Sequence, residues 1–321
     1  MTYEQYLRNR ECRLRNNIQE ESPFVFVYVT NSVSDTVSVI NNFRFRVISN
    51  IPVGHTPQGI AIASGSLAYV TNSGDDTVSA INLLTNTVIG PPIHVGNQPS
   101  SIAVTPDRTR AYVVNSFVPF SVSVINTSTD EVITTIPVKD FPRGIAITPD
   151  GTRAYVTINE DDTVSVIDTI TNKVIGAPIP VGHGPQGIAI TPNGTRAYVT
   201  NAFDNTVSVI NTITNKVIGE PIPVGKNPSG ITITPDGTRA YVTNSLANTV
   251  SVINTSTNKV IGAPIPVGSF PRGIAITPGG TRAYVANSND HTVSVIDLST
   301  NKIFGTIPVG RYPHGIAIAT L

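Results

Sequence analysis

Short runs of alternating apolar and polar residues recur along most of the chain. Between Gly187 and Gly225 there are four such runs, rich in Val, Ile, Thr and Tyr, at 187–191, 196–201, 206–211 and 216–224. Alternation with a period of two and β-branched residues indicate strands, and the repeats lack the apolar period of an α-helix. Turn residues such as those of Thr191-Pro192-Asn193-Gly194 separate the runs. We therefore expect a four-stranded antiparallel meander.

This unit is repeated. Its tyrosine returns after 41 residues once and after 43 residues five times, at Tyr28, Tyr69, Tyr112, Tyr155, Tyr198, Tyr241 and Tyr284. A period in this range is typical of repeat architectures, in which each unit buries its surface against its neighbours. The chain therefore contains seven copies of one sheet.

Both faces of each sheet are predicted to be buried. Ile188 and Ile190 point to one face and Ala189 to the other, and the third run repeats this arrangement with valines around Ser208. One face is bulky and the other is small, but neither carries a charge. Such a sheet needs a neighbour on each side, at the usual sheet-to-sheet spacing of about 10 Å.

The two ends of the repeat region complement each other. The first unit begins at Phe24 and lacks the Gly-Ile-Ala-Ile strand that opens the other units, whereas the last residues, Pro313–Ala319, supply one. An open rod would instead require polar caps at both ends. We predict an all-β, seven-bladed β-propeller of four-stranded antiparallel blades over residues 24–321, in which the C-terminal strand completes the first blade.

The tetrapeptide Tyr241-Val242-Thr243-Asn244, preceded by Thr234-Pro235-Asp236-Gly237, resembles the YVTN-type β-propeller repeat of bacterial and archaeal surface-layer-like proteins. The resemblance covers residues 24–321. Related seven-bladed propellers include binding modules, cell-surface repeats, streptogramin-type lyases and lactonases. The resemblance therefore implies the fold and leaves the function open.

Composition excludes several partners. The chain has 21 basic and 21 acidic residues, so it carries no net charge that would attract nucleic acid or an anionic membrane. Charged residues make up only 13% of the chain, and Thr, Asn and Ser carry most of the polarity. No apolar run is long enough for a transmembrane helix.

Residues 1–23 are the only segment outside the repeats. Tyr3, Leu7 and Leu14 lie near one face of a helix, which predicts an N-terminal arm that is a short helix or a frayed tail. The alternative is a self-association arm in which Cys12, the single cysteine, forms an intermolecular bond. The segment lacks the apolar core of a secretory signal, so we expect a cytoplasmic protein by default, with the cell or spore surface as the alternative.

Function is expected where the blades differ. The loop before each first strand varies most, and it should share the channel mouth with the loop between the second and third strands. The middle residues of its Pro-x-Gly motif, or of the Pro-x-Ser motif in the third unit, are Gln58, Ser100, Arg143, Gln186, Ser229, Arg272 and His314. The arginine before each signature tyrosine recurs in most units, which indicates a structural role.

An arginine-rich and aromatic arc lies within this loop set. The residues that we expect to bind ligand at the channel mouth are Gln58, Arg143, Gln186, Phe270, Arg272, Arg311, Tyr312 and His314. Arginine pairs with oxyanions and aromatic rings offer stacking faces, so the arc suits an anionic or sugar-like ligand. The alternative is an ordinary solvated rim.

Catalytic motifs are missing from the sequence. There is no nucleophile elbow and no phosphate-binding loop, and we expect no cofactor. His183 and Asp140, on adjacent blades, are the candidate metal ligands, and Glu160-Asp161-Asp162 forms a carboxylate cluster. His55 occupies the loop equivalent to that of His183 but lies across the ring.

Two functional hypotheses follow. The first is a non-enzymatic binding or scaffold propeller that presents its channel-mouth loops to a protein or glycan at a cell or spore surface. The alternative is a hydrolase or lyase, lactonase-like or streptogramin-lyase-like, with its site at the channel mouth. The near identity of units five to seven favours the first, because an enzyme usually places distinct polar groups on several blades.

Overall fold

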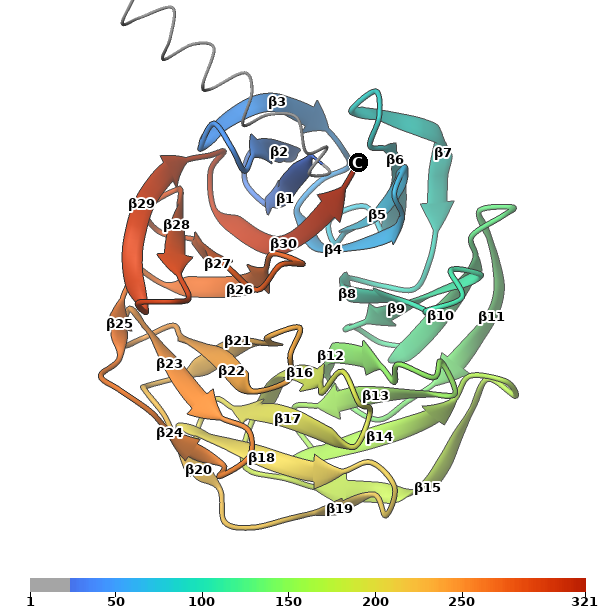
Figure 1. The fold of residues 1–321 in the computed structure, drawn as a ribbon. Helices are drawn as coiled ribbons and strands as arrows, with labels where there is room; N and C mark the ends of the chain where they lie inside the picture. The colour runs from blue at the N-terminus through green and yellow to red at the C-terminus, as the bar shows by residue number, and fades with distance from the viewer. Residues whose placement is uncertain (1–23) are drawn as a thin grey trace, which may run out of the picture.

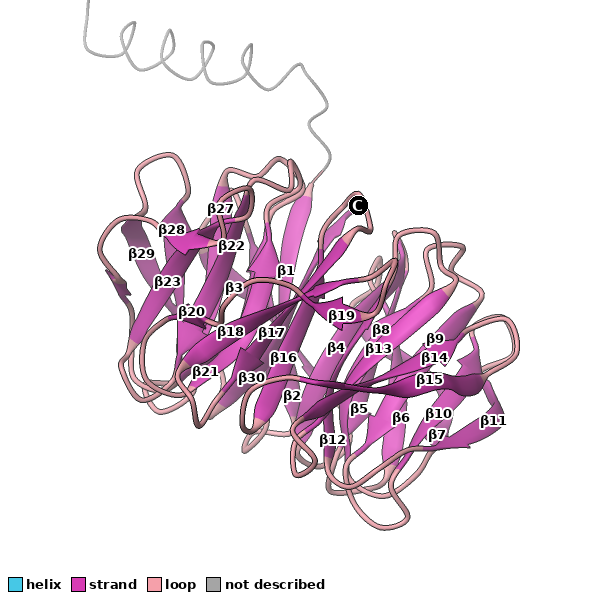
Figure 2. Cartoon of the chain, turned by 90° about the horizontal axis from the view of Figure 1, so that it is seen from below, coloured by secondary structure: helices cyan, strands magenta, loops and turns pink. Residues whose placement is uncertain are grey.

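The computed structural model describes residues 24–321, which form a closed ring of seven antiparallel β-sheets (Figure 1). Seen edge-on, the strands run between the two faces of a disc, and the loops gather on those faces (Figure 2). The predicted fold class is confirmed. The arm predicted for residues 1–23, with Cys12, lies outside the described residues. The described residues include no helix with the length and hydrophobicity to cross a membrane.

The first four blades have four strands each, which follow one another from the channel outward. Blade 1 consists of β30 (Pro313–Thr320), β1 (Val25–Asn31), β2 (Thr36–Asn41) and β3 (Arg46–Pro52). Blade 2 consists of β4 (Pro57–Ser64), β5 (Leu67–Asn72), β6 (Thr77–Asn82) and β7 (Thr87–His94). Blade 3 consists of β8 (Pro99–Val104), β9 (Arg110–Asn115), β10 (Ser121–Asn126) and β11 (Glu131–Pro137). Blade 4 consists of β12 (Pro142–Ile147), β13 (Arg153–Ile158), β14 (Thr163–Asp168) and β15 (Lys173–Pro180).

In blades 5 and 6 the outermost strand is divided in two. Blade 5 consists of β16 (Pro185–Ile190), β17 (Arg196–Asn201), β18 (Thr206–Asn211), β19 (Lys216–Val217) and β20 (Ile222–Pro223). Blade 6 consists of β21 (Pro228–Ile233), β22 (Arg239–Asn244), β23 (Thr249–Asn254), β24 (Lys259–Val260) and β25 (Ile265–Pro266). Blade 7 consists of β26 (Pro271–Ile276), β27 (Arg282–Asn287), β28 (Thr292–Asp297) and β29 (Lys302–Pro308).

The division of the outer strand corrects the continuous run predicted at 216–224. Gly219 takes a left-handed conformation with φ of 71°, and the backbone leaves the ladder there. Pro221 follows and has no N–H to donate. Prolines recur in the outermost strand of each blade. Their missing N–H breaks no hydrogen bond of the ladder there, and it discourages pairing with the edge of another sheet.

The ring is closed by pairing the two ends of the described chain. β30 pairs antiparallel with β1, with Val27 opposite Ile318 and Val29 opposite Ile316. The backbones of Phe24 and Leu321 exchange two hydrogen bonds, of 3.1 and 2.9 Å. The C-terminal strand therefore completes blade 1, as predicted.

The hydrophobic core is divided into seven clusters, each between neighbouring blades. Between blades 1 and 2, for example, Tyr28 and Val37 of one sheet pack against Ala68, Val70 and Ile81 of the next. All seven signature tyrosines are fully buried. Apolar side chains of mixed size on one sheet thus pack against those on the next, which permits close packing of sheets that carry no solvated face.

The tyrosine of each repeat, and the arginine of the last five repeats, also bond adjacent blades together. The Tyr155 hydroxyl donates to Asn215 Oδ1 of blade 5 at 2.7 Å, and Arg153 NH1 donates to the carbonyl of Thr212 in the same turn at 2.8 Å. Tyr284 makes the corresponding bond to Asn42 and so joins blade 7 to blade 1. The structural role inferred for the recurring arginine is confirmed.

The asparagine that ends the second strand bonds the third strand of its blade and lies close to the channel-mouth loop. Asn201 Nδ2 donates to Thr206 Oγ1 at 3.0 Å and to Ser208 Oγ at 2.9 Å. A Cβ on Gly182, in the loop before β16, would lie only 2.7 Å from the same amide, so this position requires glycine. Blade 4 departs at both positions, with Ile158 and Lys139.

Candidate ligand-binding pocket in the central channel

Two sets of loops form one face of the disc, which we call the mouth face. The loop before each innermost strand is bonded through its backbone to the loop between the second and third strands of the same blade. In blade 5, the N–H of Phe203 donates to the carbonyl of His183 at 3.1 Å, and that of Ala202 donates to Gly184 at 3.0 Å. The predicted sharing of one face by the two loop sets is confirmed.

The residue before each innermost strand has a left-handed backbone. The φ values lie between 48° and 66° for Thr56, Gln98, Phe141, Gly184, Asn227, Phe270 and Tyr312. This region favours glycine, so large aromatic residues there carry backbone strain. Side-chain acceptors hold the strained N–H groups: Phe270 donates to Asn248 Oδ1 at 2.9 Å and Tyr312 donates to His291 Nδ1 at 3.0 Å.

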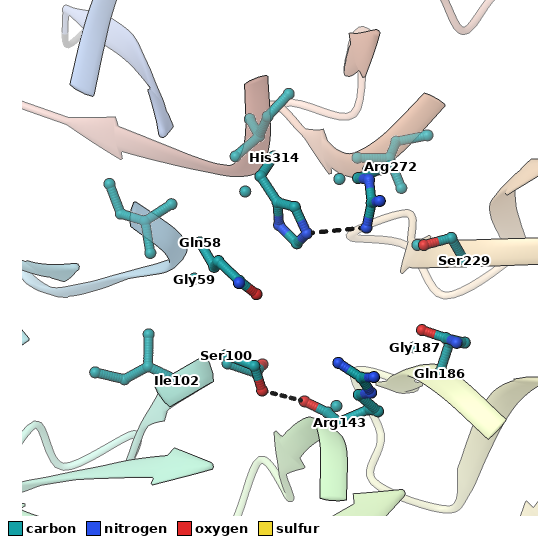
Figure 3. Close-up of a pocket in the computed structure, with 18 of the residues that line it drawn as sticks. Gln58, Gly59, Ser100, Ile102, Arg143, Gln186, Gly187, Ser229, Arg272 and His314 are labelled. Carbon is teal, nitrogen blue, oxygen red and sulfur yellow. Dashed lines mark hydrogen bonds between the residues drawn. The ribbon is translucent and has the colours of Figure 1, made fainter. Parts of the chain in front are cut away.

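The innermost strands enclose a pocket at the mouth of the channel, with a volume of about 550 Å³ (Figure 3). All seven middle residues of the varied loop motif line it, as the repeat predicts: Gln58, Ser100, Arg143, Gln186, Ser229, Arg272 and His314. Ser100 and Ser229 do not belong to the predicted ligand-binding set, although their motif position places them in the same ring. The next residues along each strand, mostly Gly and then Ile, line the rest of the pocket.

The threonine of the repeat fixes the backbone of this ring. Thr243 Oγ1 accepts the N–H of Gly230 at 2.8 Å and donates to the carbonyl of Arg272 in the next blade at 2.7 Å. A Cβ on Gly230 would lie 2.3 Å from that carbonyl oxygen, so only glycine allows the two innermost strands to approach this closely. The pocket residues therefore project from a rigid frame.

Arg272 is the most constrained of the pocket side chains. Its guanidinium lies over the rings of Phe270 and Tyr312, with 4.9 and 5.6 Å from Cζ to the ring centroids. NH1 lies 3.2 Å from His314 Nε2, and NH2 donates to the Tyr312 hydroxyl at 3.3 Å. Nε is buried and, within residues 24–321, has no hydrogen-bond partner. Phe270, Arg272, Tyr312 and His314 of the predicted arc thus form one cluster around a single cation.

His314 is neutral in this cluster. Burial in the channel lowers its pKa to about 3, and the charges of Arg272 and Arg143 contribute in the same direction. Arg272 only donates hydrogen bonds, so Nε2 is the accepting nitrogen and Nδ1 carries the proton. The imidazole therefore offers the pocket an N–H and holds its free electron pair against the guanidinium.

Arg143 enters the same pocket from blade 4 (Figure 3). Its pKa is lowered by burial and by the positive charge of Arg272, with Glu160 acting in the opposite direction. Arginine nevertheless stays protonated in proteins. Phe141, the aromatic residue before its strand, packs on Phe120 at 5.0 Å between ring centroids. No hydrogen bond or ion pair engages the Arg143 guanidinium within the described residues.

The pocket as a whole is cationic. Two arginines line it, and none of the described residues that line it carries a carboxylate. Its other polar groups are neutral amides, hydroxyls and an imidazole, which accept or donate hydrogen bonds without cancelling the charge. Such a site favours an anionic group on a ligand.

Three predicted residues lie apart from this centre. Arg311 is exposed and does not line the pocket, and its backbone N–H bonds Ser34 Oγ at 2.8 Å. His183 pairs with Asp204 at 2.9 Å and lies 3.7 Å from Asp162, so the structure does not join it to Asp140. The hydrogen bond and charge of Asp204 raise the His183 pKa. No group of three or more His, Cys, Asp or Glu side chains in residues 24–321 is placed to hold a metal ion.

Comparisons with known proteins agree with the fold. The family described as lactonase, 7-bladed beta-propeller, matches residues 171–303, which is less than half of the chain. None of the curated proteins matches the sequence.

Solved structures resemble the whole ring. A functionally unknown protein from Desulfotomaculum acetoxidans DSM 771 superposes with a TM-score of 0.82 at 20% identity, over 92% of this chain and 99% of that one. Kuenenia stuttgartiensis hydrazine synthase superposes with a TM-score of 0.73 at 23% identity, over 83% of this chain and 95% of that one. Dihydro-heme d1 dehydrogenase NirN in complex with DHE superposes with a TM-score of 0.67 at 14% identity, over 91% of this chain and 74% of that one. At these identities the likeness concerns the fold alone.

Proposed function

We propose that this propeller is a binding module whose central pocket takes an anionic group, a carboxylate or a phosphate, from its ligand. The observation that carries the proposal is the state of Arg272. Two rings and His314 hold its guanidinium in place, while its buried Nε has no partner in residues 24–321. A buried donor without a partner costs free energy, and an oxyanion in the pocket would offset that cost by pairing with the positive charge of the same guanidinium.

Arg143 supports the same proposal. Its guanidinium is charged, faces the pocket and is engaged by no side chain of the described residues. The repulsion between two cations in one pocket falls when an anion binds between them. The amides of Gln58 and Gln186 and the hydroxyl of Ser229 then remain to bond the uncharged part of the ligand, whereas the Ser100 hydroxyl is engaged by Ser116 and the carbonyl of Arg143.

The same geometry favours binding over hydrolysis. A general base needs a pKa near the working pH and a free electron pair within reach of the substrate. His314 has a pKa of about 3, and its Nε2 already faces Arg272. None of the described residues lining the pocket offers a carboxylate in its place.

Lactone hydrolysis is the second candidate, because the lactonase family match spans residues 171–303 and so includes Arg272. Two arginines beside a reacting ester would stabilise an oxyanion. The proposal of binding without catalysis requires that purified protein hydrolyse neither gluconolactone nor dihydrocoumarin above background, and that it contain no stoichiometric metal. Hydrolysis that disappears in His314→Ala or His183→Ala would support the second candidate instead.

Calorimetric titration with malonate tests the binding proposal directly. We expect saturable binding of malonate, no binding of glucose, and an affinity for malonate reduced about 10- to 100-fold in Arg272→Gln, which loses charged hydrogen bonds. The matched control is Arg44→Gln, an exposed arginine in the turn between β2 and β3, on the opposite face of the disc. Equal affinities in both variants would contradict the proposal.

A further inference from the structure

Large apolar side chains surround the pocket on the mouth face. Val33, Phe117, Phe203 and Leu246 occupy equivalent positions in the loops between the second and third strands of blades 1, 3, 5 and 6. Their exposed fractions are 53%, 46%, 69% and 63%. We call these four residues the mouth collar. Exposed apolar residues gathered around a pocket are typical of an interaction surface.

The fold does not require these side chains. The contact that the blades share at this position is a backbone bond: the N–H of Phe203 donates to His183, that of Leu246 donates to Lys226, and that of Gly74 makes the same bond to His55 in blade 2. The Phe203 ring also lies against Gly184. Glycine therefore satisfies the structural demand. Blades 2, 4 and 7 carry Gly74, Glu160 and Asn289 at the matching position, so the four apolar side chains are not a requirement of the repeat.

The mouth collar extends beyond the pocket. Val33 and Tyr312 lie among the residues that line the pocket, whereas Phe203 and Leu246 do not. A small anion held by Arg272 would leave Phe203 and Leu246 in water. A ligand that uses both features must be large enough to cover the mouth face while one anionic group enters its centre.

We propose that the mouth face docks a protein chain, which inserts an Asp or Glu side chain into the central pocket and rests apolar side chains on the mouth collar. The inference rests on the anion site proposed above and identifies the kind of partner that supplies the anion. Charge complementarity at the pocket selects the acidic residue, because none of the described lining residues carries a carboxylate and Glu160, whose charge acts on Arg143, lies outside that lining.

The aliphatic half of the collar favours protein over an acidic oligosaccharide. Sugars pack against flat aromatic faces. Val33 and Leu246 offer branched aliphatic groups, which pack against aliphatic and aromatic side chains of a protein. An anchor that enters a central pocket within a ring of apolar contacts that exclude water is the usual anatomy of a protein interface.

A peptide library displayed on phage, selected on the immobilised full-length protein and eluted with malonate, tests this inference. We expect the enriched peptides to share one Asp or Glu flanked by apolar residues. A synthetic copy of an enriched peptide should lose affinity about 10-fold or more in Arg272→Gln and in the double variant Phe203→Ser, Leu246→Ser. The double variant should keep the malonate affinity of the unmodified protein.

The matched control is the double variant Ile170→Ser, Ile213→Ser. These isoleucines are 73% and 75% exposed in the turns between the third and fourth strands, on the opposite face. Peptide affinity should not change in this control. Three outcomes would overturn the docking inference and leave the malonate site intact. The enriched peptides could lack an acidic residue, their affinity could be unchanged in the collar variant, or no peptide could be enriched.

Titration with an acidic oligosaccharide, oligogalacturonide, tests the glycan alternative. The inference would be overturned in favour of a glycan if oligogalacturonide bound more tightly than every enriched peptide, lost affinity in Arg272→Gln and kept its affinity in the collar variant. Loss of malonate binding itself in the unmodified protein would refute the pocket proposal and the docking inference together.

Discussion

Arg143 and Arg272 occupy the same position of the same motif in blades 4 and 7, but their surroundings differ. Arg272 lies over two rings and contacts an imidazole. The Arg143 guanidinium has no such partner among the described residues, although Phe141 stands before it as Phe270 stands before Arg272. The motif is identical, so the difference arises elsewhere.

The following blade makes the difference. Tyr312 and His314 of blade 1 reach Arg272 from the next blade, whereas the equivalent residues of blade 5, next to Arg143, are Gly184 and Gln186. Blade 5 supplies neither a ring nor an imidazole, and Phe141 packs on Phe120 of blade 3. One arginine is thus preorganised and the other is free to adjust. Preorganisation reduces the entropy lost when a ligand binds.

The most severe test removes β30, the strand that places His314 beside Arg272. β30 carries His314 and pairs with β1, so deletion of Pro313–Leu321 would leave Val27 and Val29 of blade 1 without their partner strand. We expect the truncated chain to unfold or aggregate, because total stability is only about 5–15 kcal/mol and a whole ladder is lost. Calorimetric melting and size-exclusion chromatography measure this. A truncated chain that melts like the full-length protein would show that β30 does not close the ring.

This closure could be predicted from sequence because the repeat displays one local pattern seven times. A first unit that lacks a strand and a tail that contains one are visible without any contact information. The break after Val217 could not be predicted, since alternation of residue types does not reveal where a backbone leaves its ladder. The bond from Tyr155 to Asn215 is also invisible in the sequence, because it joins residues 60 apart in different sheets.

The next largest effect compares the two arginines directly. Arg272→Gln should weaken malonate binding about 10- to 100-fold and Arg143→Gln only about 3- to 10-fold, because the free arginine must be ordered on binding and contributes less. Calorimetric titration of both variants measures the ratio. Equal losses would mean that the surrounding rings do not matter, and a larger loss in Arg143→Gln would place the main anion contact on blade 4.

The site was predictable where symmetry alone decides position. The seven middle residues meet in one pocket because equivalent positions of a closed ring are equidistant from its axis. Symmetry does not give side-chain direction. His183 turns toward Asp204, in the loop bonded to its own backbone, instead of toward Asp140 of the neighbouring blade, and Arg311 is exposed although Tyr312 lines the pocket.

A double variant can make blade 1 resemble blade 5. Tyr312→Gly with His314→Gln reproduces the residues found beside Arg143, and glycine suits the φ of 57° at position 312. We expect malonate affinity to fall about 3- to 10-fold, to the level of an unconstrained arginine, with little change in melting temperature. Titration and thermal melting measure the two quantities. Unchanged affinity would show that Arg272 needs no support from the next blade.

The smallest effect concerns protonation of His314. Its pKa falls from 6.5 in the unfolded chain to about 3 in the folded protein, so between these values the unfolded chain binds the proton more readily and stability decreases as the pH falls. His55 and His183 act in the opposite direction, because their pKa values are raised and their stabilisation is lost as the pH rises. The unmodified protein must therefore be compared with His314→Gln.

Urea unfolding at pH 8 and pH 6 separates these contributions. When the pH is lowered from 8 to 6, the unfolding free energy of the unmodified protein should fall by about 0.8 kcal/mol more than that of His314→Gln. The other histidines contribute equally to both proteins. A difference near this size would establish that the imidazole beside Arg272 stays neutral, as a hydrogen-bond donor at Nδ1 requires. Identical pH dependence in the two proteins would mean that His314 titrates normally, and that the constraint on Arg272 comes from Phe270 and Tyr312 alone.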